Sequence, residues 1–111
     1  MADADLRFGI VRGLRKREPA VEFLPAQGRI PDSMQDPDVL RLAASLDHVL
    51  VSHDFETMPG HIYRFLETRE STGLILIPQF WPIGRSIEEL HIVWACAEPE
   101  DLRNRIIYVP L

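Results

Sequence analysis

Apolar side chains recur along this chain at the spacing of helices, and short strand-like stretches separate the helical ones. Helical spacing covers residues 5–17, 36–46, 58–68 and 86–97. Strand candidates lie at residues 20–24, 49–52, 74–77 and 106–109. The last three consist almost entirely of apolar, mostly branched side chains, which is typical of strands buried on both faces of a parallel sheet.

The sequence also predicts where the helices start and which faces they bury. Asp36 followed by Pro37 is a favoured helix start, and Ser86 with Glu89 three residues later is a capping-box pattern. The helical period then selects the inner faces. These are Leu6, Ile10, Val11 and Leu14 in the first helix, Val39, Leu42, Ala43 and Leu46 in the second, Met58, Ile62, Phe65 and Leu66 in the third, and Ile87, Leu90, Trp94 and Ala97 in the fourth.

Strands that alternate with helices predict right-handed β-α-β units. We therefore expect an α/β fold, a three-layer sandwich with helices on both faces of a mostly parallel central sheet of about four to five strands. The length of 111 residues predicts a single domain over residues 1–111. Only a few residues precede the first helix, so we expect the first strand to be a stub or to be truncated.

Composition and charge restrict the function classes. The formal net charge of −5 argues against simple non-specific attraction to nucleic acid. Carboxylates gathered around a divalent metal would count toward this charge and yet be neutralised by the ion. The single cysteine, Cys96, excludes an internal disulfide and is expected to be buried. No apolar run is long enough to cross a membrane, so a cytoplasmic protein is expected.

Acidic residues in three loops are the main candidates for chemistry. Loops that follow parallel strands meet at one edge of the sheet, where open α/β folds bind ligands. Clustered carboxylates repel one another unless a cation offsets their charge, and hard oxygen ligands suit Mg²⁺ or Mn²⁺. Such an ion can activate water against a phosphodiester. The acids are Asp3 and Asp5 before the first helix, Asp36 and Asp38 at the start of the second, and Asp54 and Glu56 after the strand at 49–52.

Each of these acids also has an ordinary structural explanation. Asp36 is a natural helix N-cap, and Asp3 or Asp5 can cap the first helix. Glu56 fits a solvated loop. Asp54 is the hardest to explain in this way, because an acid directly after a buried strand is poor core material.

Two other chemistries fit the sequence less well. A phosphate-receiving signalling domain carries comparable acids, but it needs a lysine near its last strand, and the one lysine of this chain is Lys16. Zinc binding by His53 and His61 with a neighbouring acid would require a spacing that these residues do not have.

Three short motifs occur in a fixed order along the chain. They are Asp3-Ala4-Asp5-Leu6, Asp36-Pro37-Asp38-Val39-Leu40 and Val49-Leu50-Val51-Ser52-His53-Asp54-Phe55-Glu56. In these motifs and their order the chain resembles the small PIN-like proteins of the DUF5615 group, which are relatives of PIN-domain nucleases. The strand at 74–77 and the aromatic-proline loop after it also stand in the family's order. The chain departs from the family pattern at three positions, with Asp5 in place of asparagine, Glu56 in place of aspartate and Phe55 at a normally polar position.

This resemblance implies a PIN-like fold and Mg²⁺- or Mn²⁺-dependent cleavage of RNA, often as the toxin of a toxin–antitoxin pair. It assigns metal binding to Asp3, Asp36 and Asp54, with Glu56 as a fourth acid. It gives Ser52 the role of holding a metal-coordinated water or a substrate phosphate. Whether Asp3 or Asp5 is the N-terminal ligand stays open.

The alternative is a non-catalytic PIN-like module that pairs with an antitoxin protein or with a second copy. A missing first strand would leave a position in the sheet open for a partner segment. We expect a homodimer.

Overall fold

The structure is a computed structural model that describes residues 1–31 and 33–110, and it has a mixed α/β fold. Helices alternate with strands after the second helix, as the sequence predicts. In chain order the elements are α1 (Phe8–Arg17), α2 (Asp36–Ser45), β1 (Leu50–Ser52), α3 (Met58–Leu66), β2 (Leu74–Leu76), α4 (Ile83–Cys96), α5 (Pro99–Leu102) and β3 (Ile106–Tyr108).

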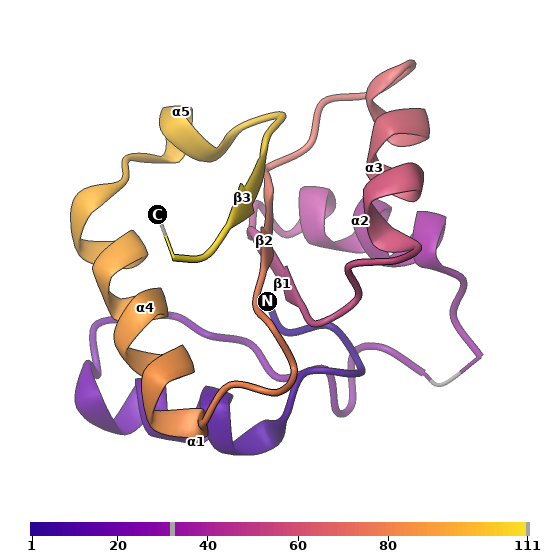
Figure 1. Ribbon diagram of the computed structural model, residues 1–111. Coiled ribbons are helices and arrows are strands. Elements are labelled where there is room, and N and C mark those ends of the chain that lie inside the picture. The colour runs from indigo at the N-terminus through magenta and orange to yellow at the C-terminus, as the bar shows by residue number, and fades with distance from the viewer. Residues whose placement is uncertain (32, 111) are drawn as a thin grey trace.

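The three strands form a parallel sheet in the order β1-β2-β3. Leu50 of β1 pairs with Leu74 of β2, which pairs in turn with Ile106 of β3. Helices α1 and α4 cover one face of the sheet, and α2 and α3 cover the other (Figure 1). Because side chains alternate along a strand, each strand contributes to both cores. Val51 and Ile75 pack toward α1 and α4, whereas Leu50 and Leu74 pack toward α2 and α3.

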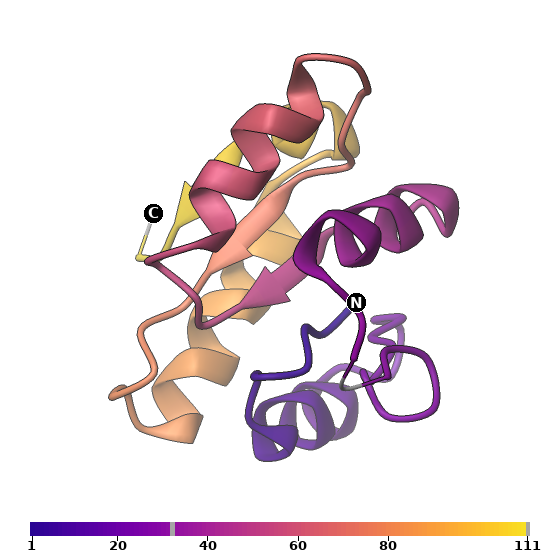
Figure 2. The ribbon, with the colours of Figure 1, turned by 90° about the vertical axis from the view of Figure 1, so that its right-hand side faces the viewer.

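The N-terminal residues run along the outer edge of β1 (Figure 2). Ala2 forms a single parallel bridge with Val51, whose carbonyl oxygen accepts a hydrogen bond from the Asp3 N–H at 2.8 Å. The first strand is therefore a stub, which is one of the two outcomes expected. The prediction of a strand at residues 20–24 is wrong, although the Leu24 carbonyl accepts a hydrogen bond from the Ala2 N–H at 2.8 Å.

The number of strands is consequently smaller than the four to five expected. The N-terminal stub bridges β1 at one residue only, so it has too few free N–H and C=O groups to pair with a further strand at residues 20–24. The part of the chain that the structure describes thus has three named strands, all parallel.

Two helices start at other residues than predicted. Helix α1 begins at Phe8, because the preceding residues form a turn in which the Leu6 N–H donates to the Asp3 carbonyl at 3.1 Å. Helix α4 begins at Ile83, so Ser86 lies inside the helix and is fully buried. The predicted capping box at Ser86 is therefore wrong.

The predicted inner face of α1 is confirmed for Ile10, Val11 and Leu14, whereas Leu6 is buried but precedes the helix. The predicted inner face of α3 is confirmed apart from the half-buried Leu66. The faces of α2 and α4 are partly wrong. Leu46 lies beyond the end of α2 and is exposed, and Trp94 is exposed because Val93 takes the inner position of α4. Cys96, expected to be buried, is exposed in the last turn of α4. None of the described helices is long and apolar enough to cross a membrane.

Candidate functional site

A cavity of about 210 Å³ lies at the carboxyl end of β1. Four of the six predicted acids line it, and they come from the N-terminal segment, the start of α2 and the turn after β1. The sheet thus brings together residues that are as far as 51 positions apart in the sequence. The lining residues are Asp3, Ala4, Asp5, Ile30, Pro31, Met34, Asp36, Val39 and Asp54.

Asp3 is the most buried of these acids, with 7% of its surface exposed. Its Oδ2 accepts a hydrogen bond from the Ser52 hydroxyl at 2.8 Å, and its Oδ1 accepts one from the Ala4 N–H at 2.8 Å. Burial raises the pKa of Asp3 above its usual range, and the negative charges of Asp5 and Asp36 raise it further, although both hydrogen bonds act in the opposite direction. The Asp3 carboxylate is therefore an anion that a nearby cation would stabilise.

Ser52 connects the N-terminal acids to the turn after β1. It is fully buried at the end of the strand, and its oxygen accepts a hydrogen bond from the Asp54 N–H at 3.0 Å while its hydroxyl faces Asp3. Asp5 Oδ1 lies 3.3 Å from the same hydroxyl. Both N-terminal acids thus converge on Ser52, so the structure leaves both as candidate ligands.

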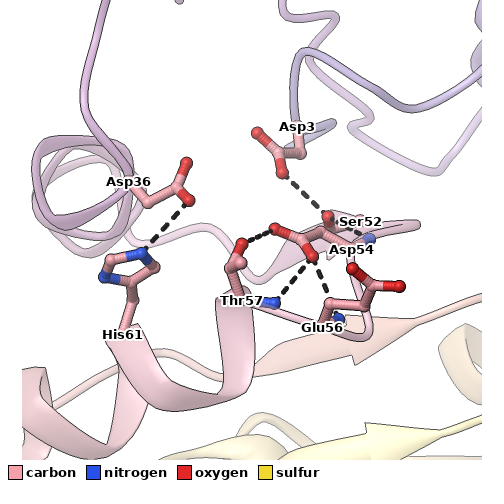
Figure 3. Close-up of polar contacts among 7 residues, drawn as sticks. All are labelled: Asp3, Asp36, Ser52, Asp54, Glu56, Thr57 and His61. Carbon is pink, nitrogen blue, oxygen red and sulfur yellow. Dashed lines mark hydrogen bonds and ion pairs between the residues drawn. The ribbon is translucent and has the colours of Figure 1, made fainter.

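Asp54 occupies a tight turn between β1 and α3. Its Oδ1 accepts hydrogen bonds from the Glu56 N–H at 3.1 Å and the Thr57 N–H at 2.9 Å, and its Oδ2 accepts one from the Thr57 hydroxyl (Figure 3). Burial acts to raise the pKa of Asp54, but these hydrogen bonds, with a smaller contribution from His61, lower it below its usual range. Asp54 therefore has a structural role in this turn, and the same contacts keep it ionised.

Asp36 lies in the first turn of α2 and is not its N-cap, which is Gln35. The capping explanation for Asp36 is therefore wrong. Its Oδ2 is 3.4 Å from Nε2 of His61, which projects from α3 (Figure 3). His61 thus orients Asp36 across the cavity from Asp54.

The two remaining acids lie outside the cavity. Glu56 is exposed, and its side chain lies beside Asp54 on the side away from Asp36 (Figure 3). Asp38 is exposed and pairs with Arg41 of the same helix at 3.0 Å. Neither is among the residues that line the cavity.

The donors suit a hard divalent cation, although they do not form a closed coordination shell. Carboxylate oxygens are the ligands that Mg²⁺ and Mn²⁺ prefer, and the cavity is large enough for an ion that retains water. Within residues 1–31 and 33–110, no three His, Cys, Asp or Glu side chains are close enough together to hold a metal directly. The residues therefore fit an ion that binds through few carboxylates and through water.

Three residues that position the site were not assigned to it from the sequence. Thr57 fixes Asp54 and His61 orients Asp36, as described above. His53 is buried, with Nδ1 2.8 Å from the Ile77 carbonyl and Nε2 3.4 Å from the Arg7 N–H. It ties the end of β1 to the chain after β2. The threonine three residues after Asp54 was the one available signal, because aspartate commonly accepts such a bond in turns.

No family model, no curated protein and no solved structure matches this chain. The resemblance to PIN-like proteins therefore stays a prediction.

Proposed function

We propose that this protein is a metal-dependent ribonuclease of the PIN-like type in which Asp3, Asp36 and Asp54 hold Mg²⁺ or Mn²⁺, in part through water that the ion retains. One observation carries the proposal: these three carboxylates come from separate parts of the chain and line one cavity at the carboxyl end of a parallel strand. Ligands of open α/β sheets bind at such positions. As the toxin of a toxin–antitoxin pair, such an enzyme would arrest growth when expressed without its partner.

The electrostatics of the cavity support a cation as its natural ligand. Burial and the neighbouring negative charges disfavour the ionised form of Asp3. A cation in the cavity would offset the repulsion among these carboxylates. When bound, a divalent ion supplies a Lewis acid that activates water and stabilises charge on a phosphodiester. The protein's own contribution is to hold the acids: Ser52 orients Asp3, and the turn after β1 orients Asp54.

The test is cleavage of a fluorescent mixed-sequence RNA by the purified protein in millimolar Mn²⁺. We expect cleavage that chelation of the metal removes and that the Asp54→Asn variant lowers by about a hundredfold or more. Asp36→Asn should have a comparable effect. Because Asp54 also stabilises its turn, thermal melts must show that both variants are folded.

Asp38→Asn is the matched control, since Asp38 is on the same helix as Asp36 but outside the cavity. It should cleave RNA at the wild-type rate. Absence of cleavage by the wild-type protein with Mn²⁺, or full cleavage by folded Asp54→Asn, would contradict the proposal.

A second candidate function is a non-catalytic module that pairs with an antitoxin or with another copy. The outer edge of β1 is hydrogen-bonded to Met1 and Asp3. This candidate is favoured instead by the outer edge of β3, which pairs only with β2 among the described strands and leaves backbone groups for a partner segment. Light scattering that gives an obligate dimer, together with calorimetry that detects no Mn²⁺ binding, would favour this candidate over the nuclease.

A further inference from the structure

A second cavity, of about 370 Å³, lies on the face of the sheet that α1 and α4 cover. Val51 of β1 and Ile75 of β2 line it from the sheet, and Leu90 and Val93 line it from α4. The segment at residues 20–23, which follows α1, lines it from a third side. Cavities of about 300–1,000 Å³ are typical of sites for small molecules. We call this cavity the apolar pocket.

The apolar pocket is separate from the acidic cavity at the carboxyl end of β1. Asp47 and His48 line it from the chain just before β1, so it reaches the opposite end of that strand. Of the residues that the structure describes, none lines both cavities. The proposed ribonuclease function therefore does not account for the apolar pocket.

Three polar side chains stand at the rim of this pocket. They are Glu22, Asp47 and His48, and the other described residues that line it are apolar. The Glu22 side chain is 77% exposed, and its Oε1 is 3.5 Å from Nε2 of His48. The His48 carbonyl accepts a hydrogen bond from the Thr72 hydroxyl, which holds the backbone next to Asp47. The pocket thus combines an apolar interior with an acidic rim.

The acids of the rim have no lysine or arginine beside them in the described lining. The Met1 amino group donates a hydrogen bond to the Val49 carbonyl at 2.6 Å. Burial lowers the pKa of this amino group to about 5, although the charge of Glu22 acts in the opposite direction. The amino group is therefore neutral at pH 7 and does not offset the acids. Such a rim attracts cations, whereas the interior favours apolar groups.

We propose that the apolar pocket is a second binding site, which takes a small amphipathic amine. The alkyl chain of the ligand packs between the sheet and α4, where release of water from apolar surface favours binding. Its ammonium group lies at the rim beside the Glu22 carboxylate. Trp94, which also lines the pocket and is 45% exposed, adds an aromatic ring that favours a nearby cation. This inference does not depend on the ribonuclease proposal.

The test compares three probes that share one alkyl chain. Calorimetry in metal-free buffer at pH 7 measures the binding of octylammonium, octanol and octanoate. We expect octanoate to bind roughly tenfold more weakly than octylammonium, because it brings a negative charge to the acidic rim, with octanol between them. Glu22→Gln should weaken octylammonium binding about threefold, which is the effect of one solvent-exposed ion pair, and leave octanol binding unchanged.

Glu18→Gln is the matched control. Glu18 also pairs with a histidine, His91, at 3.7 Å, but it is not among the residues that line the pocket. This variant should bind octylammonium as the wild type does. Val21→Trp tests the interior, because the half-buried Val21 lines the pocket from a segment outside the helices and strands. Its larger ring should fill the pocket and weaken all three probes roughly tenfold, with thermal melts to show that the variant is folded.

Methyl NMR locates the ligand without any substitution. Octylammonium should shift the signals of Val93, which lines the apolar pocket, and leave those of Val39, which lines the acidic cavity. Shifts at Val39 in place of Val93 would overturn the inference. So would octanoate binding as tight as that of octylammonium, no octylammonium binding at millimolar concentration, or wild-type affinity for octylammonium in Glu22→Gln or in folded Val21→Trp.

Discussion

The two ends of the sheet are built from different chemistry. At the amino end neutral groups satisfy one another: the Asn104 side chain accepts the Ser71 N–H at 2.8 Å, the Asn104 N–H donates to the Ser71 carbonyl at 2.9 Å, and the Gly73 N–H donates to the Ser71 hydroxyl at 3.0 Å. At the carboxyl end of β1 four carboxylates line one cavity. The first end is organised for stability, whereas the second keeps like charges together.

This difference separates residues that hold the fold from residues that can do chemistry. Neutral hydrogen bonds in a close-packed edge stabilise the chain at every pH near neutrality. Carboxylates that raise one another's pKa lower stability and are retained where a ligand uses them. Substitutions at the amino end should therefore be damaging, and removal of the Asp3 charge at the carboxyl end should be tolerated or stabilising.

The largest expected effect is at the amino end, in Gly73→Ala. Gly73 has φ of 122°, which side chains rarely adopt, and a methyl group there would overlap the carbonyl oxygen of Leu102. We expect a loss of about 3–5 kcal/mol in the free energy of unfolding, from backbone strain and from overpacking. Urea denaturation at pH 7 measures it.

Gly60→Ala is the matched control, because Gly60 lies in α3 with open space where a methyl group would go. It should gain about 0.5–1 kcal/mol from helix propensity. A loss below about 1 kcal/mol in Gly73→Ala would show that the amino end tolerates adjustment, and the contrast between the two ends would be lost.

The sequence predicted the layers of this fold better than its edges. The spacing of apolar residues identified the inner face of α1 and the strands β1, β2 and β3, because burial imposes periodicity on a sequence. The spacing could not show that residues 20–24 form no strand. Their neighbour in the fold is the N-terminal segment, and only a longer pairing of that segment with β1 would give them a strand to pair with. The sequence pattern also misplaced Ser86, because the helix start at Ile83 has no side-chain cap to mark it.

The candidate site was predictable in its members and not in their contacts. Parallel-strand topology alone predicts that loops carrying Asp3, Asp36 and Asp54 meet at one edge, and these residues do line one cavity. Their function as metal ligands stays a prediction. The contact between Asp36 and His61 depends on how α2 packs on α3, which no local pattern in the sequence encodes.

The second prediction concerns Asp3→Asn at the carboxyl end. The pKa of Asp3 is higher in the folded state than in the unfolded state, so protonated Asp3 stabilises the fold. This stabilisation is fully present below the usual aspartate pKa and is lost as pH rises through the folded-state pKa. Asparagine is neutral at every pH, so the variant does not lose stability when pH rises to 7. Its oxygen can still accept the Ala4 N–H, and its amide can donate to Ser52, whose hydroxyl can turn to Asp5. We expect the variant to melt a few degrees higher than the wild type at pH 7, with the difference shrinking toward about pH 4.

Thermal melts with and without Mn²⁺ make this test sharper. A bound ion stabilises the folded state by mass action, so Mn²⁺ should raise the melting temperature of the wild type more than that of Asp3→Asn. Asp38→Asn should respond to Mn²⁺ as the wild type does. A lower melting temperature for metal-free Asp3→Asn at pH 7 would mean that Asp3 stabilises the fold, and the proposed division between the two ends would fail.

The smallest effect is expected for Thr57→Val, which tests whether the carboxyl end also contains a stabilising carboxylate. Because the folded-state pKa of Asp54 is lowered, its contribution is present above the usual aspartate pKa and is lost as pH falls through the folded-state value. Valine removes one hydrogen bond to this carboxylate and keeps the shape of the side chain. We expect the pKa of Asp54 to rise and the free energy of unfolding at pH 7 to fall by less than about 1 kcal/mol.

A carboxyl ¹³C titration of Asp54 and urea denaturation at pH 7 measure the two changes, with the exposed Thr68→Val as the control. If the pKa of Asp54 is unchanged in Thr57→Val, the N–H groups of Glu56 and Thr57 alone lower it. A raised pKa would show that two carboxylates lining one cavity are tuned in opposite directions. Asp3 would then be the acid that gains most from a cation, and Asp54 the acid that is ionised without one.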